Sequence, residues 1–125
     1  MIYGIGTDIL EINRIKKSIE SNHFIKRVFS EEEIEMFEQK NYSPQTIAAN
    51  FCGKEAVSKS MGIGISGFSL KDISILRDEK GKPYIKLSGR ALLIAKNNKL
   101  IFNISLSHTK EYAVAFVTAQ QRNGE

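Results

Sequence analysis

Four side chains in three parts of this chain have the chemistry that phosphoryl-type transfer needs. Asp8 lies near the N-terminus, Glu55 and Lys59 are one helical turn apart in the middle, and His108 lies near the end. Two carboxylates from separate elements can hold one Mg²⁺ and still leave positions for water and phosphate oxygens. A nearby lysine can neutralise charge on a leaving phosphate, and a histidine can donate a hydrogen bond or carry a proton. Each residue alone more often has a structural role, so this hypothesis requires the four to converge.

A predicted strand over residues 1–10 carries Asp8. Its side chains alternate between two faces, and Gly4, Gly6 and Asp8 share one of them. Glycine in a strand often marks the close approach of a ligand or of another backbone. The other interpretation is a bend or bulge, with Asp8 at a solvated strand end.

A predicted helix from Pro44 to about Met61 carries Glu55 and Lys59. Ser43 is suited to cap its free N–H groups, and proline fits the first turn because its missing donor has no partner there. Apolar residues recur at steps of three and four and define one buried side, namely Ile47, Ala48, Phe51, Cys52, Ala56 and Val57. Glu55 and Lys59 lie on a different side, either as ligands or as a solvated ion pair that contributes about 0.2–0.5 kcal/mol to the helix.

The rest of the chain alternates between short helices and strands. A capping box at Ser30 and Glu33 begins a helix that runs to about Gln39. Further helices are predicted over residues 11–22 and 89–96, the latter with Leu92, Leu93 and Ala95 available for the core, and strands over 73–77, 84–87, 101–107 and 112–118. After the long helix, Gly62 and Gly64 belong to a run of glycines that is a flexible exit or, alternatively, a contact with a bound nucleotide.

The composition excludes several classes of protein. Hydrophobic residues make up 42% and charged residues 26% of 125 residues, which is typical of one soluble globular domain. We expect no membrane span, since no apolar run approaches the roughly 18 residues needed, and no signal peptide. The single cysteine, Cys52, is expected to be a buried inert thiol in a cytoplasmic protein. The net charge of +4 suits an anionic partner of some kind.

Four motifs together resemble the small bacterial holo-[acyl-carrier-protein] synthases, which are 4′-phosphopantetheinyl transferases. The similarity runs from residue 1 to about 118, in the family's order and at nearly its spacing. The motifs are Gly4-Ile5-Gly6-Thr7-Asp8-Ile9-Leu10-Glu11, Phe51-x-x-Lys54-Glu55-Ala56-x-x-Lys59, Gly81-Lys82-Pro83 and Ser105-Leu106-Ser107-His108-Thr109. The resemblance implies an α+β fold in one compact domain over residues 1–119, mainly an antiparallel sheet packed against a long central helix. Residues 120–125 are expected to form a polar C-terminal tail.

The resemblance also implies an activity and a set of site residues. The family moves 4′-phosphopantetheine from coenzyme A onto a serine of apo-acyl carrier protein, releases adenosine 3′,5′-bisphosphate and supports fatty acid biosynthesis. Asp8 and Glu55 match its Mg²⁺ ligands, with Glu55 the first and Asp8 the second choice for taking the serine proton. Lys59 matches the lysine that contacts the pyrophosphate, and His108 lies close to the coenzyme A phosphates. Other residues expected at coenzyme A are Gly62, Gly64, Lys82 and Pro83.

The family's assembly and partner are implied in the same way. Its members are homotrimers with coenzyme A between neighbouring subunits, and their acidic carrier protein docks on the basic first helix. Arg14 and Lys17 match that docking surface here. One departure is Asn50, where many relatives have arginine, so an expected contact with an anion is missing unless another residue supplies the charge. Gly53 in the same motif weakens the helix by up to about 1 kcal/mol relative to alanine.

Two other functions remain open from the residues alone. A small basic RNA- or nucleotide-binding protein without catalysis would explain the charge, but not the carboxylates at Asp8 and Glu55, which repel phosphate unless a cation lies between. A Mg²⁺-dependent nuclease or phosphodiesterase would share the metal and use water as the attacking group. A zinc site is not favoured, since the sequence has no His/Cys cluster. The resemblance favours coenzyme A and acyl carrier protein as partners, with no nucleic acid and no membrane.

Overall fold

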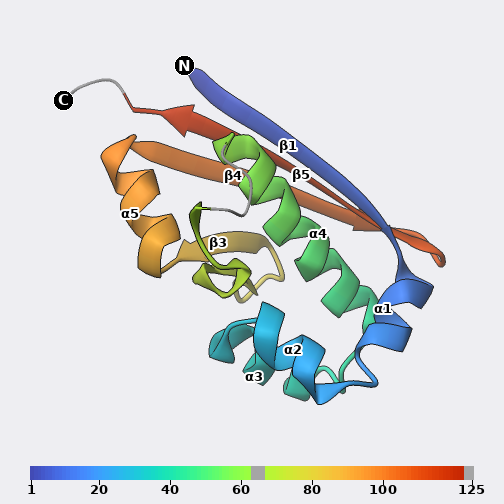
Figure 1. The fold of residues 1–125 in the computed structure, drawn as a ribbon. Helices are drawn as coiled ribbons and strands as arrows, with labels where there is room; N and C mark the ends of the chain where they lie inside the picture. Colours follow the sequence, from blue (N-terminus) through green and yellow to red (C-terminus); the bar gives the residue numbers. More distant parts are fainter. Residues whose placement is uncertain (63–66, 123–125) are drawn as a thin grey trace.

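A three-stranded antiparallel sheet and one long helix form the centre of the molecule (Figure 1). The structure is a computed structural model, and it describes residues 1–62 and 67–122. The strands lie in the order β1 (Ile2–Glu11), β5 (Tyr112–Gln121) and β4 (Leu100–His108). Helix α4 (Pro44–Met61) packs along one face of this sheet. The predicted arrangement, an antiparallel sheet packed against a long central helix in an α+β fold, is therefore confirmed.

Two glycines allow α4 to lie unusually close to β1. A methyl group on Gly6 would overlap the carbonyl oxygen of Ala56 and lie 2.8 Å from its carbonyl carbon. A methyl group on Gly4 would meet the backbone of Ser60 in the same way. The glycines of this strand thus mark the close approach of another backbone, one of the two interpretations above, and a register shift between Ile2 and Gly4 adds a local bulge. Asp8, on the same face, is directed towards α4 as a result.

Both ends of α4 have the predicted chemistry. Ser43 Oγ accepts a hydrogen bond from the backbone N–H of Thr46 at 3.4 Å, and Pro44 occupies the first turn. The helix ends at Gly62, whose φ of +78° lies in the left-handed region that favours glycine. These local signals fix where the helix begins and ends, and so set the level at which its side chains meet the sheet.

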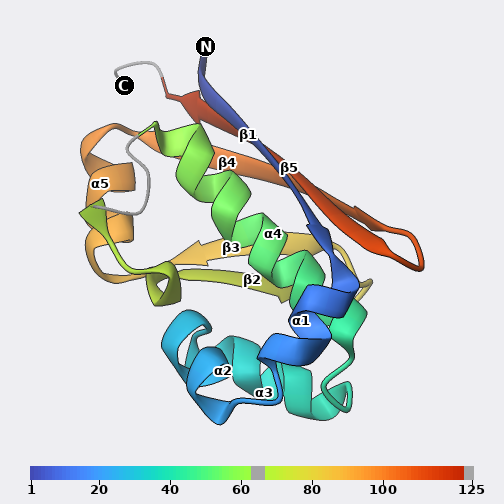
Figure 2. The ribbon, with the colours of Figure 1, turned by 45° about the vertical axis from the view of Figure 1, so that its right-hand side comes forward.

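Three short helices pack below the central sheet and α4 (Figures 1 and 2). They are α1 (Ile12–Ser18), α2 (Asn22–Val28) and α3 (Glu31–Gln39), and α3 begins with the predicted capping box. The helix predicted over 11–22 ends earlier, at Ser18, where the Ser18 hydroxyl donates to the Arg14 carbonyl oxygen and tighter backbone turns follow. The sequence reading did not predict α2, which packs Phe24 against Phe29 and Phe51.

A second sheet and one helix complete the described chain. The short helix η2 (Leu70–Asp72) leads into the hairpin of β2 (Ile73–Arg77) and β3 (Pro83–Leu87), which packs beside α4 and β4 (Figure 2). Helix α5 (Gly89–Asn97) follows. Ala95 is buried as predicted, but the prediction that Leu93 belongs to the core is wrong, because its side chain is exposed on the outer face of α5. Strand β5 continues to Gln121, three residues beyond its predicted end at Thr118.

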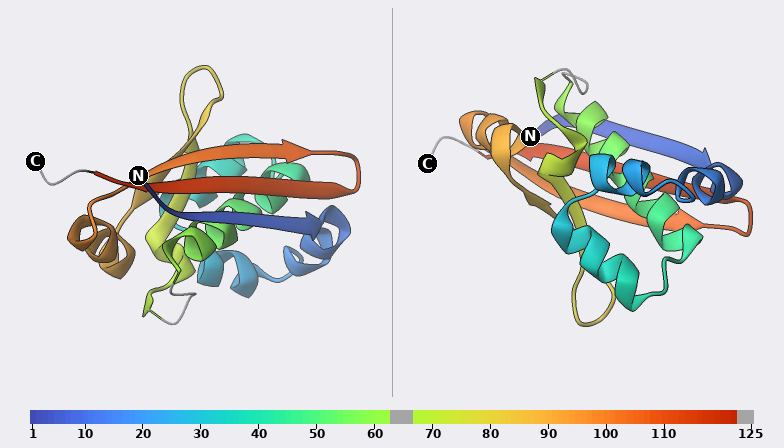
Figure 3. Two further views of the ribbon diagram at one scale, coloured as in Figure 1. Left: turned by 90° about the horizontal axis from the view of Figure 1, so that it is seen from above. Right: turned by 60° about the horizontal axis from the view of Figure 1, so that its bottom comes forward.

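The face of the sheet opposite α4 has no helix of the described chain over it. Seen from above, the three strands lie in front of all the helices (Figure 3). Exposed apolar side chains gather on this face, which we call the outer apolar face and define by Tyr3, Ile5, Ile9 and Phe116. Within residues 1–62 and 67–122 no helix is both long and apolar enough to cross a bilayer.

Candidate active site

Asp8, Glu55 and Lys59 lie together where β1 meets α4. Lys59 Nζ is 3.5 Å from Asp8 Oδ1 and donates a hydrogen bond to the carbonyl oxygen of Thr7 at 2.9 Å. Glu55 is half-buried one turn before Lys59, and Asp8 and Lys59 both act on its charge. The sequence hypothesis required four residues to converge, and the structure brings three of them together through the glycine face of β1.

The charge of Asp8 disfavours the charged form of Glu55. Burial raises the pKa of Glu55, the negative charge of Asp8 raises it further, and Lys59 only partly offsets this. A divalent cation between the carboxylates would remove this repulsion. Among the described residues no three His, Cys, Asp or Glu side chains form a cluster, so a cation here would have two carboxylate ligands. Mg²⁺ binds through one or two carboxylates together with water and phosphate oxygens, so Asp8 and Glu55 fit that ion.

Cys52 lies beneath this cluster and is inert. Its side chain is fully buried and its thiol contacts the carbonyl oxygen of Ala113 at 3.5 Å. Burial, then the nearby carboxylate of Asp8, raises the pKa of the Cys52 thiol to about 12. The prediction of a buried, unreactive thiol is confirmed. The structure adds that this thiol packs below Asp8, which follows from its position one turn before Glu55 on α4.

His108 lies elsewhere in the same chain. It ends β4, whereas Asp8 belongs to β1, and β5 separates these two edge strands. Two strand spacings amount to about 9–10 Å, and α4 occupies the sheet face between the two residues. A single subunit therefore does not bring His108 to the Asp8–Glu55–Lys59 cluster. The four side chains form two separate half-sites.

The second half-site is a cavity of about 340 Å³ on the opposite flank of α4. His108, Gly81 and Pro83 line it, so two of the four resembling motifs meet here. The turn before Pro83 is held by Asp78, whose carboxylate accepts hydrogen bonds from the backbone N–H groups of Lys80 and Lys82 at 2.9 Å. The Lys82 side chain is exposed and is not among the residues that line the cavity.

Arg77 and Asn50 belong to this half-site and were not singled out as a pair from the sequence. Arg77 lines the cavity, and its Nη2 donates to Asn50 Oδ1 at 2.8 Å. Asn50 is fully buried, and its Nδ2 donates to Glu33 Oε2 at 2.9 Å and to the Ile75 carbonyl oxygen at 2.8 Å. No local pattern signals this contact, since the two residues are 27 positions apart in different elements.

A buried ion pair supports the Asn50 side chain. Glu33 and Lys54 are in direct contact with no exposed side-chain area, and Lys54 Nζ also donates to the Leu70 carbonyl oxygen at 3.0 Å. Burial raises the pKa of Glu33 and lowers the pKa of Lys54, against the mutual attraction of the pair. Gly53 beside them packs against Ile75 and Ile104, which accounts for a small residue at that helix position.

The remaining predicted residues lie apart from both half-sites or outside the described residues. Gly62 caps the end of α4, and Gly64 lies outside the described residues. Arg14 and Lys17 are exposed on α1, while Ile12 and Ile15 of the same helix are buried. The first helix therefore turns its basic side outwards.

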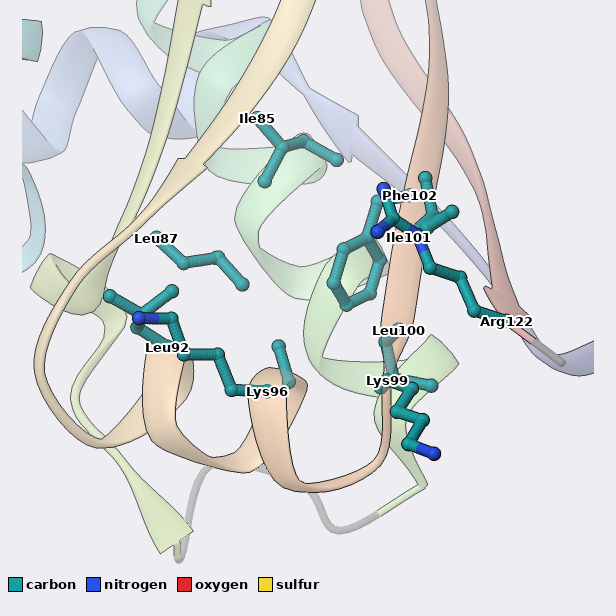
Figure 4. Close-up of a pocket in the computed structure, with 10 residues that line it drawn as sticks. Ile85, Leu87, Leu92, Lys96, Lys99, Leu100, Ile101, Phe102 and Arg122 are labelled. Carbon is teal, nitrogen blue, oxygen red and sulfur yellow. The ribbon is translucent and has the colours of Figure 1, made fainter. Parts of the chain in front are cut away.

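A cavity larger than that of the second half-site lies away from this chemistry. It has a volume of about 580 Å³ and is formed by α5, β3 and β4, with Ile85, Leu87 and Phe102 on its walls and Lys96, Lys99 and Arg122 among its lining residues (Figure 4). The residues that line it in the described chain include no acid and no histidine. Because it has no group able to accept a proton or share a metal, we assign the chemistry to the smaller sites.

Known proteins agree with the fold and the motifs. The sequence model of the 4′-phosphopantetheinyl transferase superfamily matches residues 4–117. A holo-[acyl-carrier-protein] synthase of Clostridium botulinum (strain Alaska E43 / Type E3) is 50% identical over 117 residues, which cover 93% of this chain and 95% of that protein. Another, from Alkaliphilus metalliredigens (strain QYMF), is 52% identical over 118 residues, covering 92% and 96%.

Two solved structures share the whole fold. The holo-(acyl-carrier-protein) synthase of Bacillus anthracis str. Ames, in complex with CoA (3′,5′-ADP), has a TM-score of 0.83 and 35% identity over 98% of this chain and 99% of that one. The holo-[acyl-carrier-protein] synthase of Neisseria meningitidis has a TM-score of 0.90 and 31% identity, covering 97% and 100%. The chain therefore belongs to the 4′-phosphopantetheinyl transferase superfamily and, within it, to the holo-[acyl-carrier-protein] synthases.

Proposed function

We propose that this enzyme transfers 4′-phosphopantetheine from coenzyme A to a serine of apo-acyl carrier protein, and so supports fatty acid biosynthesis. The observation that carries the proposal is the meeting of Asp8, Glu55 and Lys59 at one point of the fold. A relative 35% identical to this chain is known in complex with CoA. The reaction forms a bond between the serine oxygen and the β-phosphorus of coenzyme A. The phosphoanhydride bond breaks, and adenosine 3′,5′-bisphosphate leaves.

Asp8 and Glu55 would hold Mg²⁺ in this reaction. When bound, the ion polarises the diphosphate and stabilises the negative charge of the departing bisphosphate. The carboxylates supply the two negative charges that fix it, and a cation there would offset the repulsion that Asp8 exerts on the charge of Glu55. The rest of the chemistry belongs to the side chains of the chain itself.

Lys59 is suited to the leaving group. Its side chain is 57% exposed and its Nζ is held at the rim of the cluster by the Thr7 carbonyl oxygen. From there the ammonium can turn from Asp8 to a phosphate oxygen and neutralise charge as the bisphosphate departs. Phosphoryl transfer depends mainly on such positioning and charge stabilisation.

Glu55 takes the proton of the attacking serine, directly or through a water, and Asp8 is the alternative. A carboxylate beside the ion can accept this proton because it lies next to the diphosphate that the serine attacks. Since Glu55 is only half-buried, it remains reachable from solvent. The position and exposure of Glu55 therefore support this role.

The complete site lies between subunits of a homotrimer. Two features support this part of the proposal. Asp8 and His108 fall in separate half-sites of one chain, so a neighbouring copy is needed to bring one half-site to the other. The outer apolar face exposes Ile5 and Ile9 by 61% and 64%, and a contiguous apolar surface of this kind is typical of a protein–protein interface.

The carrier protein docks on α1. Arg14 and Lys17 place positive charge on its exposed side, and an acidic partner would be steered towards it by the net charge of +4. The single cysteine is consistent with the cytoplasm as the compartment.

The direct test is to incubate the protein with coenzyme A, Mg²⁺ and apo-acyl carrier protein and to determine the mass of the carrier. We expect the mass to rise by one phosphopantetheine group and adenosine 3′,5′-bisphosphate to appear in equal amount. An apo-carrier whose attachment serine is replaced by alanine is the control and should stay unmodified. An unmodified wild-type carrier, with Mg²⁺ present and the enzyme folded, would overturn the proposal.

A further inference from the structure

Arg77 forms no ion pair with any acidic side chain that the structure describes. The ion pairs within the described residues are Lys54–Glu33, Lys59–Asp8 and Lys86–Glu32, and none of them includes Arg77. Its guanidinium donates to the Asn50 side chain at 2.8 Å and, at a long 3.4 Å, to the carbonyl oxygens of Ile75 and Leu76. Of its five N–H donors, at least two are left for a ligand.

The Asn50 amide has only one orientation that satisfies its neighbours. Its Nδ2 donates to two acceptors, Glu33 Oε2 and the Ile75 carbonyl oxygen, so its Oδ1 must point towards Arg77. Glu33 is in direct contact with Lys54, so it attracts Arg77 only at a distance and forms no ion pair with it. A fully buried and fully bonded amide thus holds a half-buried guanidinium in one place.

The guanidinium lines the cavity of the second half-site together with His108. The other polar side chains around this cavity are those of Gln45, Thr46 and Ser105, and its lining in the described chain contains no carboxylate. A planar guanidinium beside a histidine and hydroxyl groups, in a cavity whose described lining has no acid, suits a phosphate group.

We infer that Arg77, oriented by Asn50, is a specificity-determining residue that binds the phosphomonoester of the donor nucleotide. This inference rests on the proposed function, in which the donor is coenzyme A. The diphosphate of that donor is engaged by the Asp8–Glu55–Lys59 half-site of one subunit. Its third phosphate, a monoester on the ribose, then lies at the Arg77–His108 half-site of the neighbouring subunit. Arg77 thereby supplies the charge that Asn50 cannot.

The test compares two donors, coenzyme A and 3′-dephospho-coenzyme A, which differ only in that monoester. In Arg77→Gln we expect kcat/KM for coenzyme A to fall roughly ten- to a hundredfold, the range of a lost charge-assisted hydrogen bond. The fall should come mainly from KM, and kcat/KM for the dephosphorylated donor should stay within about twofold of wild type. Lys86→Gln removes one positive charge from the same hairpin, outside both half-sites, and should leave both donors unaffected.

A binding measurement separates this inference from the proposed function. Calorimetric titration of wild type and Arg77→Gln with adenosine 3′,5′-bisphosphate and with adenosine 5′-monophosphate needs no catalysis. The variant should lose affinity for the bisphosphate alone. A wild-type enzyme that leaves the carrier unmodified but shows this selective loss would overturn the function and keep the phosphate site. An equal loss for both donors and both nucleotides, or no loss, would overturn the role of Arg77.

Moving the positive charge from position 77 to position 50 tests whether the two residues serve the same part of the cavity. Its side chain ends 2.8 Å from the guanidinium, so an arginine at position 50 can reach the same part of the cavity. We expect Asn50→Arg combined with Arg77→Gln to regain at least half of the preference for coenzyme A, on a logarithmic scale. If the double variant unfolds at the wild-type temperature but regains no preference for coenzyme A, an arginine at position 50 does not replace Arg77. If it fails to fold, the single variant decides.

Discussion

Glu55 has two proposed roles in the first half-site, as a ligand of Mg²⁺ and as the acceptor of the serine proton. Replacement by glutamine keeps the size of the side chain and removes both its charge and its basicity. We expect Glu55→Gln to fold normally and to lose roughly 10²–10⁴-fold in kcat/KM, because a general base contributes about that much. The measurement is the initial rate of carrier modification over a series of Mg²⁺ concentrations.

The matched control is Glu35→Gln, which removes one carboxylate from the exposed side of α3. It should retain full activity at every Mg²⁺ concentration. Turnover of Glu55→Gln close to wild type at low Mg²⁺ would mean that this carboxylate neither holds the ion nor accepts the proton.

Single residues differ in how far their surroundings could be predicted from the sequence. The hypothesis that Asp8, Glu55, Lys59 and His108 converge holds for the first three. A local signal supported their meeting, since Gly4 and Gly6 leave room for a second backbone. The bond between Arg77 and Asn50 had no such signal, because it depends on how the end of β2 meets the middle of α4. The prediction that Leu93 belongs to the core was wrong for the same reason. An apolar side chain alone does not indicate which side of α5 the rest of the fold will cover.

At the scale of elements, the contact of β1 with α4 is what positions the first half-site. Gly6→Ala would force a methyl group into the backbone of Ala56. We expect the free energy of unfolding to fall by about 3 kcal/mol, at the upper end of overpacking effects, because backbone cannot rotate away as a side chain can. Urea unfolding followed by circular dichroism measures this loss.

Gly53→Ala is the comparison within α4 itself. The new methyl group would meet side-chain atoms of Ile75 and Ile104 at 3.1–3.2 Å, and these can shift. Alanine also gains up to about 1 kcal/mol of helix propensity over glycine. We expect a change within about 1 kcal/mol of wild type. Similar stability losses for the two variants would show that the close approach of β1 and α4 has no special cost.

Helix boundaries followed local chemistry where a cap was present. Ser30, Ser43 and Gly62 mark ends that the sequence predicted, and the structure has them within one or two residues. The boundary between α1 and α2 lacks such a cap, since Ser21, which precedes α2, makes no side-chain capping bond. Helix α2 is only seven residues long and depends on aromatic packing by Phe24 that arises only in the folded chain.

Helix α1 gives a prediction about the carrier protein. Arg14→Glu reverses a charge on its exposed side and leaves the buried Ile12 and Ile15 in place. We expect KM for the carrier to rise at least tenfold while the affinity for coenzyme A stays within about twofold, since like charges now oppose an acidic partner. Steady-state kinetics with each substrate varied in turn measures both. Equal damage to the two substrates would refute a separate docking surface on α1.

At the scale of the whole molecule, the separation of Asp8 from His108 is the strongest constraint on assembly. If each active site takes Asp8 from one subunit and His108 from the next, subunits of two inactive variants can complement each other in a mixed oligomer. Asp8→Asn and His108→Ala should each be strongly impaired alone. Unfolded together in equal amounts and refolded, they should regain about a quarter of wild-type activity, because one interface in four then pairs an intact Asp8 with an intact His108.

Two alternatives give different numbers in the same experiment. If each subunit contained its whole site, every subunit in the mixture would lack one residue, and no activity would return. Mixing Asp8→Asn with Glu55→Gln provides the control, because both residues belong to the same half-site and no interface can then be complete. Recovery in the first mixture without recovery in the second requires an active site shared between copies of the chain. No recovery in either, with trimers present by size-exclusion chromatography and light scattering, would place the whole site within one subunit.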